Sequence, residues 1–161
     1  MGLLNRDRAR RVEPPASAYV GGGDAPDYAT AFAARLLDRD DRSVEQWMRS
    51  ILEDAPRILE WFVLLGWKLV LRLRLAPRGA PDAIAGWTIV ETTPDSMVLE
   101  VRSSLVRARK VLDVEADRVR LTTYVWYESR AGRLVWSALA PVHHRIEPLL
   151  LTLAASRRRA G

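Results

Sequence analysis

The chain has 161 residues, of which 48% are hydrophobic and 28% charged, and it contains six tryptophans and no cysteine. This is the size and composition of one globular domain with its own core. Without cysteine, disulfide scaffolds, thiolate nucleophiles and iron–sulfur clusters are excluded. The N-terminal residues carry charges but no continuous apolar segment of signal-peptide length, so we expect a cytoplasmic protein.

The formal net charge of +5 comes from the two ends of the chain. Residues 1–13 carry a net charge of +2 and residues 157–159 add +3, whereas residues 14–156 contain 18 basic and 18 acidic side chains. A nucleic-acid-binding domain needs a basic stripe on its folded surface, so we expect no nucleic-acid partner. We expect the basic ends to be solvated, with a weak contact to an anionic membrane surface as the alternative.

Linker residues precede the predicted domain: Pro14-Pro15, then Gly21-Gly22-Gly23, then Pro26. This pattern predicts a disordered basic segment over residues 1–26. One folded domain is then expected over residues 27–156, followed by a basic tail over residues 157–161.

A short apolar run over residues 28–37 predicts the first strand, and a helix follows it. Ser43 and Gln46 have the spacing of a capping box, and apolar residues then recur at helical spacing as far as Pro56. Pro56 can open a second helix, which we expect to be buried because residues 58–65 are apolar on nearly all sides. Residues 69–75 fit both a helix and a strand, and we prefer a continued helix. Charges within residues 58–75 argue against a membrane span and favour a buried or interfacial element. A third possible function is therefore contact with a membrane surface through this element and the basic ends.

From residue 87 the pattern predicts an antiparallel meander, with strands over residues 87–92, 97–103, 105–114, 119–128 and 133–140. An apolar helix is expected from Pro141 onward. Proline lacks the N–H that bonds one turn back, so Pro148 is expected to bend or restart this helix.

This order of elements resembles the START-like, or SRPBCC, superfamily, in particular an uncharacterised bacterial branch of it. The resemblance also rests on Gly86-Trp87, on the run Pro141-Val142-His143-His144 and on the leucine-rich last helix. It implies an α+β helix-grip fold, in which a curved antiparallel sheet wraps around a long C-terminal helix and two helices are inserted after the first strand. An apolar cavity is implied between sheet and helix. Members include lipid and hormone binders, polyketide cyclases and allergen-like carriers, so the resemblance does not choose a function.

His143 is the titratable residue of most interest, because a helical wheel places it at the edge of the apolar stripe while His144 points away. Glu147 lies four residues further on, within reach of His143. An imidazole oriented by a carboxylate can act as a general acid or base. The alternative is a histidine that only bonds backbone or caps the sheet.

Lys110 breaks the alternation of its strand, since it falls on the same face as the apolar Ala108 and Leu112. An inward lysine can pair with the carboxylate of a ligand. The alternative is a bulge, or a lysine stem that reaches along the cavity mouth.

The expected function is binding of a small hydrophobic or aromatic molecule, as a carrier or sensor. The alternative is a polyketide cyclase or isomerase that uses the same cavity, with His143 as acid–base group aided by Glu147 and Lys110. No cofactor or metal is expected, since the sequence has no nucleotide or zinc-protease motif and adjacent histidines lie about 100° apart on a helix. The residues expected to line the pocket are Trp61, Trp87, Leu99, Val101, Trp126, Trp136, Ile146 and Leu150.

Overall fold

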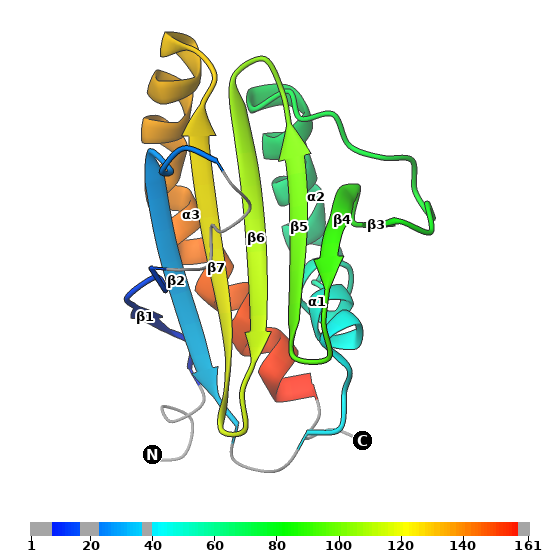
Figure 1. The fold of residues 1–161 in the computed structure, drawn as a ribbon. Coiled ribbons are helices and arrows are strands. Elements are labelled where there is room, and N and C mark those ends of the chain that lie inside the picture. Colours follow the sequence, from blue (N-terminus) through cyan, green and yellow to red (C-terminus); the bar gives the residue numbers. More distant parts are fainter. Residues whose placement is uncertain (1–7, 17–22, 37–39, 158–161) are drawn as a thin grey trace.

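The computed structural model describes residues 8–16, 23–36 and 40–157 (Figure 1). Over these residues, seven strands form one curved antiparallel sheet in the order β1-β2-β7-β6-β5-β4-β3, and helices cover one of its faces. The long C-terminal helix packs on that face, so the predicted α+β class is confirmed. The strands are β1 (Arg10–Val12), β2 (Tyr28–Arg35), β3 (Ala83–Ile84), β4 (Trp87–Thr92), β5 (Ser96–Arg102), β6 (Val106–Val114) and β7 (Arg118–Tyr127). The helices are α1 (Val44–Leu52), α2 (Arg57–Leu65), the π-helix η1 (Gly66–Val70) and α3 (Arg130–Ser156).

The predicted strand over residues 28–37 and the first four predicted strands of the meander are present as β2, β4, β5, β6 and β7. Strands β6 and β7 pair along their whole lengths, which places Lys110 directly opposite Thr123. Both side chains are buried, on the face that the helices cover. The alternation of β6 therefore continues through Lys110 without a bulge.

The predicted fifth strand, over residues 133–140, is wrong, because these residues belong to α3. Ser129 caps this helix by accepting a hydrogen bond from the backbone N–H of Gly132 at 3.0 Å. Gly132 allows the helix to approach the turn between β5 and β6, since an added Cβ would lie 1.8 Å from the carbonyl oxygen of Leu105. The helix also continues through Pro148 without a restart.

Part of the segment that was expected to be disordered is built into the fold. Strand β1 pairs with β2, and the backbone N–H of Ala9 donates to Thr152 Oγ1 of α3 at 3.0 Å. On the outer face of the sheet, the Tyr124 hydroxyl donates to the carbonyl of Pro15. Arg157, assigned to the basic tail, donates to the backbone carbonyl of Ser50. The remainder of the predicted tails, residues 1–7 and 158–161, lies outside the described residues, as do residues 17–22.

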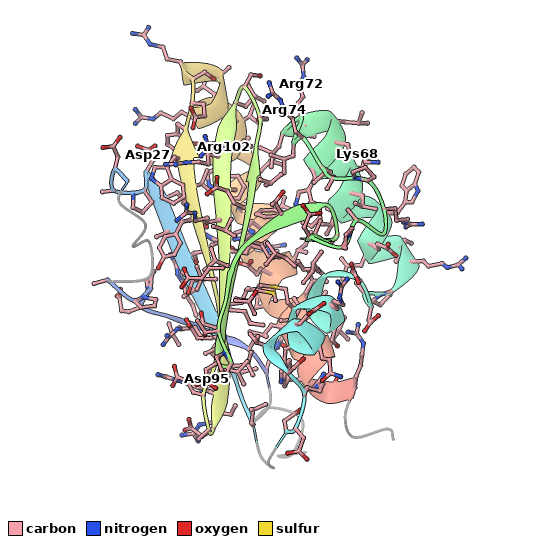
Figure 2. The ribbon with its side chains drawn as sticks, turned by 45° about the vertical axis from the view of Figure 1, so that its right-hand side comes forward. Asp27, Lys68, Arg72, Arg74, Asp95 and Arg102 are labelled. Atoms are coloured by element: carbon pink, nitrogen blue, oxygen red, sulfur yellow. The ribbon has the colours of Figure 1, made fainter. Side chains whose placement is uncertain are left out.

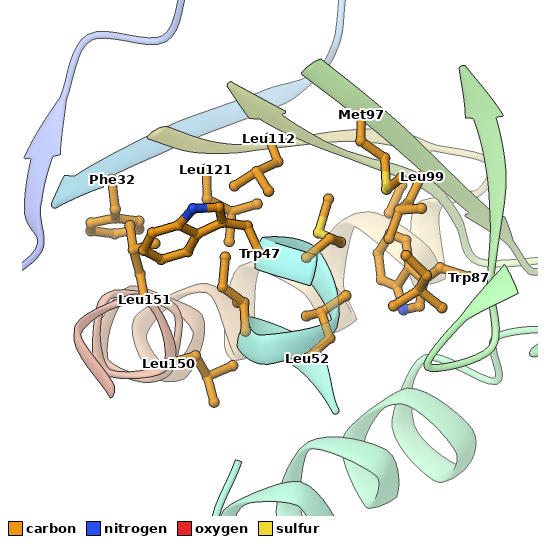
Figure 3. Close-up of a cluster of buried hydrophobic side chains, with 14 of the residues drawn as sticks. Phe32, Trp47, Leu52, Trp87, Met97, Leu99, Leu112, Leu121, Leu150 and Leu151 are labelled. Atoms are coloured by element: carbon orange, nitrogen blue, oxygen red, sulfur yellow. The ribbon is translucent and has the colours of Figure 1, made fainter. Parts of the chain in front are cut away.

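Helix α1 carries the centre of the core. The predicted capping box is confirmed: Ser43 Oγ accepts from the backbone N–H of Gln46 at 3.1 Å, and the Gln46 side chain accepts from that of Ser43 at 2.8 Å. Trp47 of this helix is fully buried and points toward Phe32 and Leu121 of the sheet (Figure 3). The cap thus fixes the start of the helix that fills the space between the sheet and α3.

The prediction that the second helix is buried is wrong. No residue of α2 or η1 is buried, and Trp61 and Leu69 are 70% and 68% exposed. The helical stretch ends at Val70, since Arg72 adopts a left-handed conformation with φ of 52°, so the preferred helix continuation extends only part of the way to residue 75. Among the described residues, no helix is long and apolar enough to cross a membrane.

Candidate functional site

A cavity of about 220 Å³ lies where the resemblance places one, between the sheet and the helices. Strands β4, β6 and β7 form its sheet wall, and α1, α2, η1, the segment after η1 and α3 form its other walls. Its lining is apolar or aromatic except at four side chains: Lys110, Thr123, His143 and Glu147. The cavity therefore combines an apolar wall with one polar cluster.

The cluster is centred on the Glu147 carboxylate, which α3 brings to the middle of the sheet. Lys110 Nζ donates to Glu147 Oε1 and, at 2.9 Å, to Thr123 Oγ1. Thr123 Oγ1 in turn donates to Glu147 Oε1 at 2.6 Å. The side chains of Lys110 and Glu147 are 7% and 2% exposed, so their charges neutralise each other away from water. A buried charge pair of this kind needs such additional hydrogen bonds to be tolerated.

Glu147 is ionised at neutral pH despite its burial. Burial alone raises the pKa of the carboxyl, but the attraction of His143 and Lys110 outweighs it and lowers the pKa from 4.5 to about 2. Glu147 is therefore a fixed negative charge rather than a proton donor. It holds Lys110 and His143 in place on the cavity wall.

His143 completes the cluster from the same helix. Its Nε2 atom lies 2.8 Å from Glu147 Oε2, which is the contact that the spacing of four residues predicts. This contact is an ion pair when the imidazole is protonated, and it contributes to the low pKa of Glu147. Within the described residues, the buried indole nitrogens of Trp87 and Trp136, whose side chains also line the cavity, have no hydrogen-bonding partner. Buried polar atoms without partners cost free energy, so these two N–H groups favour a ligand that accepts hydrogen bonds.

His144 does not point away from the fold, as expected, but packs on β2. Its ring stacks on Tyr28 at a centroid distance of 5.9 Å, and its Nε2 lies 2.5 Å from the Tyr28 hydroxyl. Burial raises the pKa of Tyr28 to about 12, so the hydroxyl stays protonated and donates a hydrogen bond to the unprotonated imidazole. Burial, and then the charge of His143, lower the pKa of His144. Among the described residues no three His, Cys, Asp or Glu side chains are arranged to hold a metal ion.

Most of the residues predicted from the sequence meet at this cavity. All three candidate catalytic residues line it, together with Trp87, Trp136, Ile146 and Leu150. Trp136 does so from α3 rather than from a strand.

The other four predicted pocket residues lie elsewhere. Leu99 and Val101 are core residues outside the cavity lining, and Trp61 is exposed on α2. Trp126 belongs to a small cluster with Val111 and Tyr124, separate from the main core. On β7 its position alternates with the inward Val125, which places it on the outer face of the sheet.

Thr123 and Trp67 are among the cavity residues that the sequence did not predict. Thr123 has a signal in the alternation of its strand, since it lies two residues after the inward Leu121. Trp67 lines the cavity from η1 and packs edge to face on Trp87 at a centroid distance of 5.4 Å. It carries no comparable signal, because π-helical winding cannot be read from helical periodicity.

The fold and the cavity define an α+β domain in which a curved sheet and a long C-terminal helix enclose a buried ionisable cluster. The chain belongs to the family of proteins of unknown function DUF2867, which matches residues 24–149. No curated protein matches the chain.

Two solved structures are similar to it. One is the solution NMR structure of a protein from Arthrobacter aurescens, with 13% identity over 80% of this chain and 86% of that chain and a TM-score of 0.40. The other is the crystal structure of CalU16 from Micromonospora echinospora, with 19% identity over 96% of this chain and 93% of that chain and a TM-score of 0.30.

Proposed function

We propose that this protein binds a small, largely apolar molecule that bears a neutral oxygen group, and that it acts as a carrier or sensor. One observation carries the proposal: an apolar cavity with the cluster of Lys110, Thr123, His143 and Glu147 in its wall. Membership of the START-like superfamily is part of the same proposal and is supported by the order of elements and by the packing of α3 on the sheet.

The size of the cavity favours a compact ligand. An apolar protein cavity of about 150 Å³ is enough to bind benzene. The cavity here, at about 220 Å³, fits a molecule of one or two rings, or a short acyl chain. A long-chain lipid would extend beyond it.

The electrostatics of the cluster favour a neutral ligand over an anion. The charge of Lys110 is already balanced by Glu147, so the alternative in which this lysine pairs with the carboxylate of a ligand is not supported. The hydrogen bonds that a ligand can supply are those to the two indole N–H groups without partners. The N–H groups of Trp87 and Trp136 donate to a hydroxyl or carbonyl oxygen.

The proposal is tested by ligand-induced thermal shift and by quenching of tryptophan fluorescence. The probes are 1-naphthol as the neutral alcohol, naphthalene as the hydrocarbon and 1-naphthoate as the anion. We expect 1-naphthol to bind most tightly and 1-naphthoate least. Equal weak binding of all three, or preference for the anion, contradicts the proposal.

Filling the cavity provides the matched variant. Ala108→Leu adds three carbon atoms to a buried residue of the cavity wall, whereas Ala116→Leu makes the same change on an exposed turn. We expect Ala108→Leu to weaken 1-naphthol binding by at least about tenfold, since each added methylene competes for space in a close-packed site. Ala116→Leu is expected to bind as the parent protein does.

A second function is favoured by the position of His143, which places an imidazole beside a carboxylate at the cavity. In this alternative the protein is a polyketide cyclase or isomerase, with His143 as acid–base group, while Glu147 and Lys110 position it. His143→Gln should then lower turnover of an aromatic polyketide precursor by roughly 10²- to 10⁴-fold and leave its affinity within a few-fold. Unchanged turnover in this variant would contradict the enzyme alternative, and only the carrier or sensor function would remain.

A further inference from the structure

The outer face of α2 and η1 carries an apolar stripe that no described part of the chain covers. Its residues are Ile58, Trp61, Phe62, Leu65 and Leu69, and they are between 39% and 84% exposed. They recur at the spacing that places residues on one face of a helix. A soluble helix normally turns such a stripe toward the core, yet here the inward side is formed by other residues, Leu59 and Trp67. The helix is thus apolar on two faces, and one of them has no partner within the described chain.

Basic side chains surround this stripe. Residues 57–78 contain five basic residues and one acidic residue, although residues 14–156 as a whole are neutral. Lys68, Arg72 and Arg74 are exposed, and Figure 2 shows them gathered around the C-terminal end of the π-helix. Within the described residues none of the three forms an ion pair, whereas the acidic residue, Glu60, pairs with Arg78. The face therefore presents apolar side chains and unbalanced positive charge together.

The stripe also borders the opening of the cavity. Phe62, Leu65 and Val70 from this face, and Val142 from α3, line the cavity and are themselves between 38% and 53% exposed. These residues mark the place where the cavity meets the surface. A surface bound to the stripe would thus lie against the cavity mouth.

We propose that the α2–η1 face docks onto the surface of an anionic lipid bilayer. An amphipathic helix with tryptophan, phenylalanine and leucine on one side and cations beside them lies in the plane of a bilayer interface. Tryptophan is suited to that interface because its ring is apolar while its N–H can bond to water or headgroups. Each cation near an anionic surface adds about 1 kcal/mol of attraction.

The charges disfavour the other simple occupant, a second copy of the chain. A twofold interface places the same patch on both sides, so the positive charges of Lys68, Arg72 and Arg74 would meet a patch whose one acidic residue, Glu60, is already paired with Arg78. An anionic bilayer supplies the opposite charge. In this arrangement the cavity mouth faces the lipid, and a ligand of the proposed kind exchanges between cavity and bilayer. That exchange rests on the proposed function, whereas the docking does not.

Vesicle flotation of the full chain tests the docking. The probes are extruded vesicles of phosphatidylcholine, with and without about 30% phosphatidylserine, at low and at high salt. We expect binding to the phosphatidylserine vesicles that decreases as salt rises, and weak binding to phosphatidylcholine alone. Failure to float with either vesicle, or equal binding to both, overturns the proposal.

Paired variants locate the docking face. Leu69→Asp on η1 and Leu134→Asp on α3 make the same change at side chains that are 68% and 72% exposed. We expect Leu69→Asp to lower vesicle binding by at least about tenfold, because a charge at the apolar boundary is costly, and Leu134→Asp to leave it unchanged. Lys68→Gln and Arg74→Gln should each lower binding to the anionic vesicles by about fivefold.

Sedimentation velocity tests whether the α2–η1 face binds a second copy of the chain instead of a bilayer. If the parent chain is a dimer that Leu69→Asp makes monomeric, and vesicle binding is the same in both, the face is a self-association surface and the proposal is overturned. Measuring 1-naphthol binding to Leu69→Asp without vesicles shows whether the cavity still binds its ligand, so a failure of docking is distinguished from a failure of the proposed function. Since Leu69 lies outside the cavity lining, that binding is expected to equal the parent's.

Discussion

Lys110 and Glu147 form a buried ion pair that joins the centre of the sheet to the C-terminal helix across 37 positions of sequence. A buried pair of this kind stabilises a fold less than apolar residues of the same volume would, since both charges lose their hydration. Its presence in the wall of a cavity therefore fits a role in binding or positioning better than a role in stability. Removing one partner is nevertheless costly, because the other charge is left buried and unpaired.

Glu147→Gln is expected to lower the free energy of unfolding by about 3 kcal/mol, since it leaves the ammonium of Lys110 without a counter-charge. Lys110→Met should have a cost of similar size. The double variant should lose less than the sum of the two, because it removes both charges together. Urea denaturation at neutral pH measures all three.

The matched control is Glu45→Gln, which breaks the pair between Glu45 and Arg49 on α1. Those side chains are 51% and 36% exposed, so the change should cost less than about 1 kcal/mol. A cost for Glu147→Gln that is no larger than that of the control would mean that the buried pair is not formed in solution.

Acid should weaken the fold through Glu147. Its folded pKa of about 2 lies below the unfolded value of 4.5, so the unfolded state takes up the proton first as the pH falls. The stabilisation is fully present above the unfolded pKa and is lost as the pH falls from about 5 toward 2, amounting to on the order of 3 kcal/mol. Urea denaturation of the parent and of Glu147→Gln across this range should show the difference between them shrinking, with most of it gone by about pH 3. A constant difference would show that the pKa of Glu147 is not lowered.

Removing residues 1–13 should destabilise the domain. The prediction of a disordered basic segment suggests that they are dispensable, yet the deletion removes β1, which pairs with β2, and the hydrogen bond from Ala9 to Thr152. We expect a loss of about 1 to 3 kcal/mol from these backbone hydrogen bonds and the packing of Ala9. Deleting residues 1–7 alone leaves β1 intact and serves as the control. Equal thermal midpoints for the parent and the longer deletion would show that β1 does not dock in solution.

Gly132 and Gly66 should respond in opposite ways to the same substitution. Gly132→Ala places a methyl group 1.8 Å from a backbone oxygen of Leu105, which cannot move without disturbing the sheet. We expect it to cost about 3 kcal/mol or more. Gly66 has a helical φ of −59° and open space around it, so Gly66→Ala should stabilise the protein by about 0.5 kcal/mol. Thermal denaturation of the two variants compares them, and similar midpoints would contradict the close approach of α3 to the turn between β5 and β6.

The local signals predicted most of the fold. Alternation located the strands from residue 87 to residue 128, and the capping box located α1, because both depend on neighbouring residues alone. The strand predicted over residues 133–140 is wrong, since these residues fit a strand and a helix about equally and the helix is set by its cap at Ser129. The predicted burial of α2 is wrong for a different reason. Apolar residues on all sides indicate burial only if something covers them, and sequence periodicity carries no information on what lies opposite.

The candidate site was predicted in part for the same reasons. His143 and Glu147 lie one turn apart on a helix, so their contact follows from spacing. The inward position of Lys110 follows from alternation, but its pairing with Glu147 depends on how α3 crosses the sheet, which no local pattern specifies. The prediction that Trp126 lines the pocket is wrong because an aromatic side chain on a strand does not by itself indicate which face it occupies, and alternation with Val125 places Trp126 on the outer face.

The titration of His144 should depend on the charge of its neighbour His143. Burial first, and then the charge of His143, lower the pKa of His144 below 6.5, and protonation would also disrupt the bond that the Tyr28 hydroxyl donates to it. Because the folded pKa is the lower one, the unfolded state binds the proton more readily, and this residue favours folding less as the pH falls below 6.5. His143→Gln removes the second cause and should raise the pKa of His144 toward its ordinary value, as followed by NMR titration of the imidazole nitrogens. Arg145→Gln changes the neighbouring position, which does not contribute to the shift, and should leave the titration where it is. If His143→Gln also leaves the pKa of His144 unchanged, the two imidazole rings lie farther apart in solution than the centroid distance of 6.1 Å in the structure.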